Sequence, residues 1–126
     1  MISNRKPVVV IFARAPRMGV VKKRLATDIG RYNACKFYLH NTDRVIRRLS
    51  VHPFWELKLC ISPANVRGIC RIWPMTEYIF GQCRGDLGKR MEQAILQFQT
   101  RPVLLVGSDI PDINRNDILE GFFSLI

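Results

Sequence analysis

Short runs of apolar residues alternate along the chain with longer stretches of helical periodicity. Residues 8–13 (VVVIFA) are continuously apolar and mostly β-branched, as expected for a strand covered on both faces. Further strands are predicted at 57–61, 78–80 and 102–106. The run at 8–13 is short for the core of a secretory signal and is followed at once by cations, so we interpret it as a strand.

Between these strands, apolar residues recur every three or four positions. One such helical pattern spans residues 32–49, and a loop or short helix follows the second strand. Another helix is predicted after Asp86, which can cap it, and a last one from Asn114 with Asp117 three residues on. The helix after Asp86 is expected to bury one apolar stripe, made of Leu87, Met91, Ala94, Ile95 and Phe98.

The alternation of strands and helices defines the fold class. It predicts an α/β three-layer sandwich with a mostly parallel, Rossmann-like sheet. The 126 residues form one domain, without repeats or linkers, and are short for a complete α/β enzyme.

The positive charge is concentrated in the first 50 residues. They contain 12 Lys and Arg against Asp28 and Asp43, whereas residues 51–126 contain 8 basic and 8 acidic residues, and the net charge is +10. A solvated basic face would explain this charge, but clustering favours a polyanionic partner, because like charges repel until a counter-charge arrives.

Cysteine spacing and hydropathy bear on the cellular compartment in which the protein is expected. The cysteines form no CxxC pair, which favours neither a zinc site nor a disulfide framework, and no stretch approaches the ~18 consecutive apolar residues of a membrane span. We therefore expect a cytoplasmic protein without a membrane partner.

A basic turn follows the first strand. Residues 12–25 (FARAPRMGVVKKRL) contain five cations with Pro16 and Gly19 between them. Ligands of parallel α/β sheets bind at the carboxyl ends of the strands, and Arg and Lys there can make charge-assisted hydrogen bonds to phosphates. The alternative is a merely solvated turn. The five cations are Arg14, Arg17, Lys22, Lys23 and Arg24.

Two further loops follow predicted strands. GQCRGDLGKRM (81–91) offers Gly85, Asp86 and Arg90, and GSDIP (107–111) places Asp109 just past the fourth strand. Asp109 could hold Mg²⁺ or Mn²⁺ together with substrate phosphates, or it could cap the next turn. All three loops are expected to meet on one rim of the sheet.

These motifs carry a family resemblance. FARAPRMGVVKKRL, GDLGKRM and VGSDIP resemble the signatures of the rSAM/selenodomain-associated transferase family. That family belongs to the GT-A superfamily of nucleotide-diphospho-sugar transferases and is distantly similar to nucleotidyltransferases such as phospholactate guanylyltransferase. The resemblance covers roughly residues 8–123 and implies a GT-A-type fold.

The resemblance also implies roles for individual residues. Asp109 would be the metal ligand and a catalytic residue. Lys22 is the second catalytic candidate, because a Lys can supply a point charge at the leaving group. The nucleotide-binding residues would be Ala13, Arg14, Arg17, Gly19, Lys22, Arg24, Gly85, Asp86 and Arg90.

Two departures from the family pattern matter. Lys23 stands where the family usually has Thr. Family members are also longer, so the chain resembles the N-terminal half of the fold without an acceptor half. The strand at 102–106 is then expected to leave one apolar edge unpaired, through which a homodimer could form.

The leading hypothesis is a metal-dependent nucleotidyl- or glycosyltransferase that uses Mg²⁺ or Mn²⁺ and binds a nucleoside triphosphate or nucleotide sugar. One alternative is a catalytically inactive nucleotide-binding remnant. Another is nucleic-acid binding through the arginines of the first long helix.

Overall fold

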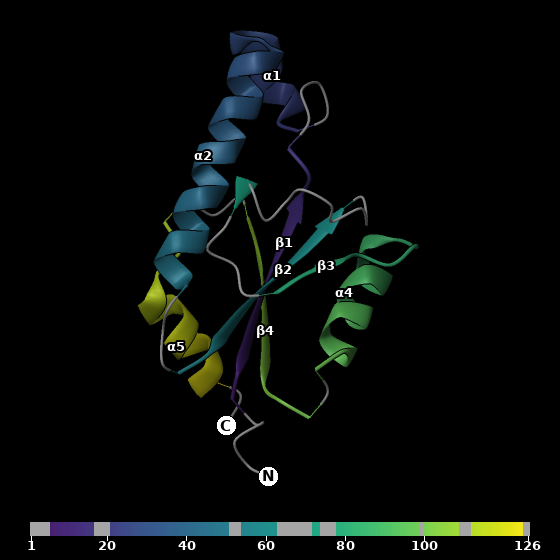
Figure 1. Ribbon diagram of the computed structural model, residues 1–126, viewed down its shortest axis with the longest axis vertical. Helices are drawn as coiled ribbons and strands as arrows, with labels where there is room; N and C mark the ends of the chain where they lie inside the picture. The colour runs from purple at the N-terminus through teal and green to yellow at the C-terminus, as the bar shows by residue number, and fades with distance from the viewer. Residues whose placement is uncertain are drawn as a thin grey trace.

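The chain folds into a four-stranded sheet with helices on both faces (Figure 1). The computed structural model describes residues 6–16, 21–50, 54–62, 72–73, 78–98, 100–108 and 112–124. The strands are β1 (Val8–Arg14), β2 (Glu56–Ser62), β3 (Tyr78–Gly81) and β4 (Val103–Gly107). The helices are α1 (Lys23–Ile29), α2 (Arg31–Leu49), α4 (Leu87–Leu96) and α5 (Arg115–Phe123). Within the described ranges, no helix has the length and apolar character that crossing a membrane requires.

The sheet is parallel throughout. Its strand order is β3-β2-β1-β4, so β1 is flanked by β2 on one side and by β4 on the other. Each predicted strand agrees with an observed one to within a residue or two, and the predicted α/β class is confirmed.

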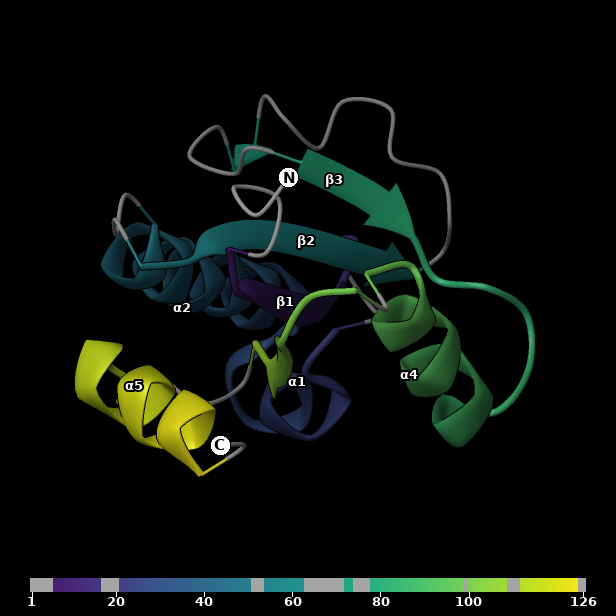
Figure 2. The same cartoon turned by 90° about the horizontal axis from the view of Figure 1, so that it is seen from below.

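Both faces of β1 are buried, which explains its uninterrupted apolar sequence. Val9 and Ile11 belong to the larger core cluster, whereas Val8 and Val10 belong to a second cluster on the opposite face. Figure 2 shows α2 and α5 on one side of the sheet and α4 on the other. The predicted three-layer arrangement is therefore present.

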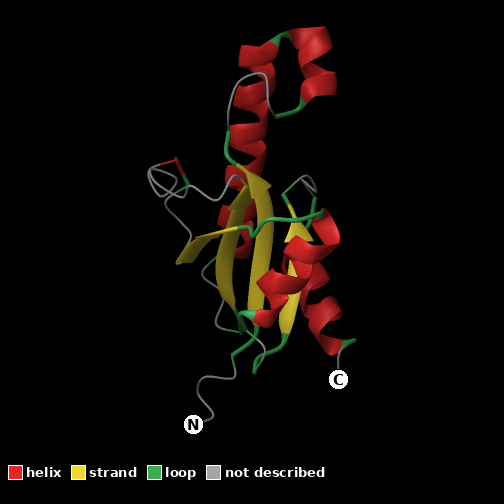
Figure 3. Cartoon of the chain, turned by 90° about the vertical axis from the view of Figure 1, so that its right-hand side faces the viewer, coloured by secondary structure: helices red, strands yellow, loops and turns green. Residues whose placement is uncertain are grey.

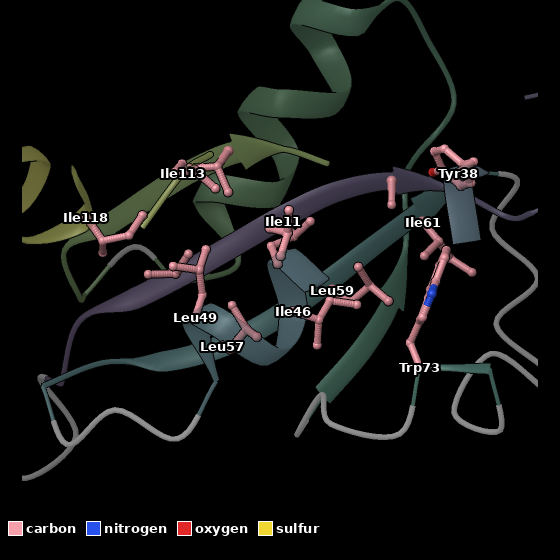
Figure 4. Packing of buried hydrophobic residues seen from close by; sticks show 14 of the residues in the cluster. Ile11, Tyr38, Ile46, Leu49, Leu57, Leu59, Ile61, Trp73, Ile113 and Ile118 are labelled. Carbon is pink, nitrogen blue, oxygen red and sulfur yellow. The ribbon is translucent and has the colours of Figure 1, made fainter. Parts of the chain in front are cut away.

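The larger cluster lies between the sheet and α2. Ile46 and Leu49 of α2 pack over Leu57 and Leu59 of β2 (Figure 4). The indole Nε1 of Trp55 donates a hydrogen bond of 2.8 Å to the carbonyl of Leu49, which satisfies the last turn of the helix. This packing fixes the position of α2 relative to the strands.

The predicted apolar stripe of α4 is wrong in part. Ala94 is buried, but Leu87 and Ile95 are 56% and 41% exposed. The hydrophobic cluster on this face includes Ala94 and has Phe98 packed against it, whereas Leu87 and Ile95 lie outside it. Both helix caps are as predicted: the Asp86 carboxylate accepts from the Lys89 backbone N–H, and Asn114 opens a capping box.

Helix α1 is a difference from the sequence analysis, which treated residues up to Arg24 as a single turn. Lys23 and Arg24 instead form the start of α1, and Lys22 precedes it in a left-handed conformation with φ 53°. Helix α1 has seven residues, none of them buried, so it lacks the periodic stripe by which helices are recognised. Figure 3 shows α1 and the start of α2 projecting beyond the strand ends.

Strand β4 is an edge strand among the described residues, because it pairs only with β1. This agrees with the expected unpaired edge. Helix α5 covers one face of the strand so closely that a Cβ added to Gly121 would lie 2.9 Å from Leu104 Cδ2. Association of two chains through the edge of β4 stays a prediction.

An ion pair connects the amino-terminal ends of the strands. The Arg101 guanidinium donates to the Glu56 carboxylate and, at 2.6 Å, to the Lys6 carbonyl, and Lys58 Nζ lies 3.7 Å from Glu56. The hydrogen bond from Arg101 holds the pKa of Glu56 below its ordinary value, against the opposing effect of burial.

This lowered pKa predicts a pH dependence of stability. Because the native pKa of Glu56 lies below the unfolded value of 4.5, its contribution is complete above that pH and is lost as the pH falls through the native pKa. Glu56→Gln should lower the free energy of unfolding by about 0.5–1 kcal/mol at neutral pH. The loss is small because the Arg101–Glu56 ion pair is partly exposed.

Urea unfolding of the wild type and the variant from neutral pH to about pH 3 measures this effect. The stability difference between them should shrink towards acid. Glu92→Gln, at an exposed position of α4, is the control and should leave the pH profile unchanged. A difference for Glu56→Gln that is constant across the whole pH range would contradict the prediction.

Candidate functional site

The carboxyl ends of the strands surround one cavity of about 1000 Å³. Arg14 ends β1, Ser62 ends β2, Gln82 follows β3, and Gly107 and Ser108 come from β4 and the residue after it. The described parts of the three predicted loops therefore converge on one rim, because all four strands point the same way.

The lining of this cavity is cationic. Three of its cations belong to the segment after β1, one ends β1, and one comes from α4. The described lining residues include no Asp or Glu. The five cations are Arg14, Lys22, Lys23, Arg24 and Arg90.

A second part of the wall is apolar and comes from the α1–α2 hairpin. Ile29 and Phe37 line the cavity although they are 41% and 48% exposed. Lys22 Nζ lies 5.8 Å from the centroid of the Phe37 ring, a cation–π contact that joins the basic and aromatic parts of the wall. The cavity can therefore accept a ligand that has both an anionic group and a flat or apolar group.

Tyr38 fixes the end of β1. Strand β4 pairs with β1 only as far as Phe12, with a further hydrogen bond from Ser108 N to the Phe12 carbonyl, so Arg14 extends past its neighbour. The Tyr38 hydroxyl accepts from Arg14 N at 2.7 Å and donates to Arg14 O at 2.8 Å. One buried side chain thus substitutes for the absent strand partner.

Gln82 connects three separate segments at the same rim. Its Nε2 lies 3.4 Å from the Ala13 carbonyl and 3.3 Å from the Cys60 carbonyl, and its Oε1 accepts from Arg90 Nη1 at 2.9 Å. Neither Gln82 nor Tyr38 is among the residues that the sequence predicts for the site, and Tyr38 was expected only as part of the helix at 32–49. No local signal could have found Gln82, since Ala13 lies 69 residues away in sequence.

The structure brings several of the predicted nucleotide-binding residues together and separates others. Gly85 and Asp86 do not line the cavity, because Asp86 Oδ1 accepts from Lys89 N at 2.8 Å and caps α4, with Gly85 before it at φ 126°. The predicted nucleotide-binding residues that line the cavity are Ala13, Arg14, Lys22, Arg24 and Arg90, and their role in binding stays a prediction. Those that lie outside the described residues are Arg17, Gly19 and Asp109.

The described residues do not by themselves form a metal site. Within the part of the chain that the structure describes, no three His, Cys, Asp or Glu side chains group where they could hold an ion. A cationic lining fits phosphate oxygens rather than Mg²⁺ or Mn²⁺, which require oxygen ligands. Asp109 directly follows the cavity residue Ser108 in sequence and stays the predicted ligand.

Two arginines of α2 are engaged within the chain. Arg47 Nε donates to Asp43 at 2.7 Å, and Arg48 Nη1 donates to the Ile113 carbonyl at 3.1 Å. These contacts leave fewer cations of this helix for the phosphates of a nucleic acid.

A parallel sheet with a cationic cavity at its carboxyl ends has its candidate site where open α/β sheets bind their ligands. The chain is similar to the crystal structure of a "putative nucleotide-diphospho-sugar transferase" from Desulfovibrio desulfuricans G20, with a TM-score of 0.83 and 28% sequence identity over 95% of this chain. It spans 54% of that protein, about half its length. The expected nucleotide-diphospho-sugar transferase fold is thereby confirmed.

The family is shown by a second comparison. The chain belongs to the family described as "Uncharacterized protein conserved in bacteria (DUF2064)", whose model matches residues 45–125. A search of curated proteins found no match. The narrower subgroup that the three motifs resemble stays a prediction.

The contact of Tyr38 with Arg14 can be tested by Tyr38→Phe. The variant leaves the partly buried N–H and C=O of Arg14 without their hydrogen-bond partner, which should cost about 0.5–1.5 kcal/mol of stability. Denaturant unfolding measures the loss. Tyr32→Phe, on the exposed part of α2, is the matched control and should be neutral. Equal stability of Tyr38→Phe and the wild type would show that this hydroxyl does not hold the end of β1.

Proposed function

We propose that the protein binds the phosphates of a nucleoside triphosphate or nucleotide sugar in the cavity at the carboxyl ends of the strands, as the nucleotide-binding part of a nucleotidyl- or glycosyltransferase. The observation that carries this proposal is the convergence of five cations on one cavity with no described carboxylate in its lining. The similarity to a protein named as a nucleotide-diphospho-sugar transferase supports the transferase class.

Electrostatics favour a polyphosphate. Five neighbouring cations repel one another, and a di- or triphosphate relieves this repulsion by placing several negative charges between them. Arg14, Arg24 and Arg90 offer guanidinium forks, which match the oxygens of a phosphate group in pairs. Lys22 adds a compact charge beside Phe37.

The apolar wall supports a nucleotide over a simple anion. A nucleotide carries a flat base beside its phosphates, and Phe37 and Ile29 offer exposed apolar surface beside the cations. Aromatic rings stack favourably on such surfaces. The cavity volume of about 1000 Å³ also exceeds what an inorganic phosphate would fill.

The chemistry proposed for the site is charge stabilisation. Transfer of a nucleotidyl or glycosyl group leaves a pyrophosphate or nucleoside diphosphate, and fixed cations stabilise the charge that develops on it. Lys22 is proposed to act at this leaving group. A phosphate acceptor would need no general base, because it is already ionised.

Removal of single cations tests the phosphate site. Arg14→Ala and Lys22→Ala should each weaken the binding of a nucleoside diphosphate or triphosphate without metal by about 10- to 100-fold, the loss of one charge-assisted contact of about 1.5–3 kcal/mol. Isothermal titration calorimetry in the presence of a chelator measures this, with a panel of bases.

Arg44→Ala is the control for net charge, because Arg44 is exposed on α2 and does not line the cavity. Unchanged affinity in both cavity variants would rule out the site. Nucleotide binding by the wild type without any transfer activity would instead favour the inactive remnant.

Asp109→Asn tests the predicted metal ligand. If Asp109 holds Mg²⁺ or Mn²⁺, the variant should lose most of the additional affinity that the metal gives to the nucleotide and keep the affinity measured in chelator. Asp112→Asn is the control at a neighbouring exposed carboxylate. Calorimetry with and without metal separates the two contributions, and an unchanged metal effect in Asp109→Asn would remove this residue from the site.

A further inference from the structure

Gln82 occupies the centre of a network that connects the ends of two strands to one cation of the cavity. Its amide nitrogen lies within hydrogen-bond distance of the carbonyl oxygens of Ala13 in β1 and Cys60 in β2. Its amide oxygen accepts from Arg90 Nη1 at 2.9 Å, the shortest of the three contacts. The described contacts therefore use both ends of the amide.

The chemistry of the partners determines the orientation of this amide. A guanidinium only donates hydrogen bonds and a backbone carbonyl only accepts them, so the oxygen of Gln82 must face Arg90 and the nitrogen must face the strands. A Glu at this position would face the two carbonyls without a donor. A Met of similar length would make neither kind of contact.

The Arg90 side chain makes few other contacts with the residues that the structure describes. Its Nε lies 3.4 Å from the Asp86 carbonyl, a longer contact than the one with Gln82. The guanidinium has five N–H donors, and these two contacts use only part of them. Because Arg90 also lines the cavity, its remaining donors are available to an anion there.

We propose that Gln82 is a positioning residue of the phosphate site, which holds the Arg90 guanidinium towards the cavity while joining the ends of β1 and β2. An Arg side chain has many rotamers, so an anion that binds a free Arg90 must first order it. Gln82 reduces this cost by ordering the guanidinium in advance. The inference rests on the proposed function of the cavity.

A double-mutant cycle tests this role with inorganic pyrophosphate, without metal, as the probe. Arg90→Ala should weaken pyrophosphate binding about 10- to 100-fold, and Gln82→Met about 5-fold. In the Arg90→Ala background, Gln82→Met should change the affinity less than about 2-fold, because the residue that it positions is gone. Gln97→Met, an exposed glutamine after α4, is the matched control and should bind as the wild type does.

A merely structural role gives a different result. If Gln82 only stabilised the strand ends, Gln82→Met would weaken pyrophosphate binding equally with and without Arg90, and the proposal would be overturned. Loss of thermal stability alone does not distinguish the two roles, which is why affinity is compared across the cycle.

A ligand-free measurement separates this inference from the proposed function. The Arg90 Nη1–H signal in a ¹H–¹⁵N spectrum, assigned by its absence in Arg90→Ala, should be shifted from the position of a free arginine in the wild type, because Nη1 donates to Gln82. In Gln82→Met it should move to that position. A wild type that does not bind pyrophosphate would contradict the proposed phosphate site. An Arg90 signal that Gln82→Met leaves unchanged would contradict the positioning role of Gln82, whether or not pyrophosphate binds.

Discussion

The burial of β1 on both faces is the constraint on which the rest of the structure depends. Val8 and Val10 pack under α4, and Val9 and Ile11 pack under α2 and α5, so no face of this strand is left for polar side chains. With β2 and β4 paired along its two edges, β1 is accessible only at its ends. Polar side chains that bind a ligand can therefore lie only at the rim where the parallel strands end.

Unequal strand lengths shape that rim. Because β4 stops pairing at Phe12 while β1 continues to Arg14 beside β2, the end of β1 lacks a strand partner on the β4 side. The Tyr38 hydroxyl fills this place by binding Arg14, and the Gln82 amide contacts Ala13, which also pairs with β2. The same side chains line the cavity, so the groups that close the sheet also build the site.

Some of the basic residues of the site lie in a segment with an unusual backbone conformation. Lys22 adopts a left-handed conformation that non-glycine residues seldom take, and it directly precedes α1. Helix α1 contacts mainly α2, and none of its side chains is buried. Its position therefore depends little on the hydrophobic core, and a ligand held between its cations and Arg90 would add the contacts that the core does not supply.

Particular residues show how far the sequence could predict the site. Arg14 and Arg90 were predicted for the site because they lie in segments after predicted strands and in motifs that resemble a family, and the structure places both in the cavity lining. Asp86 was predicted both as a cap and as a pocket residue, and its carboxylate is occupied by the Lys89 N–H. The cap of a helix and a bound ligand use the same carboxylate oxygens, and only the tertiary structure shows that the cap uses Oδ1 of Asp86.

The sequence by itself determined the strands, the long helices, the parallel class and the basic rim, because these depend on local hydropathy periodicity and on the order of the elements. The tertiary structure decided the strand order, the exposed first turn of α4, helix α1, and the roles of Tyr38 and Gln82. The physical reason is distance along the chain. The hydrogen bonds of Gln82 join residues 8, 22 and 69 positions apart, and no local pattern records which distant backbone groups will lack partners.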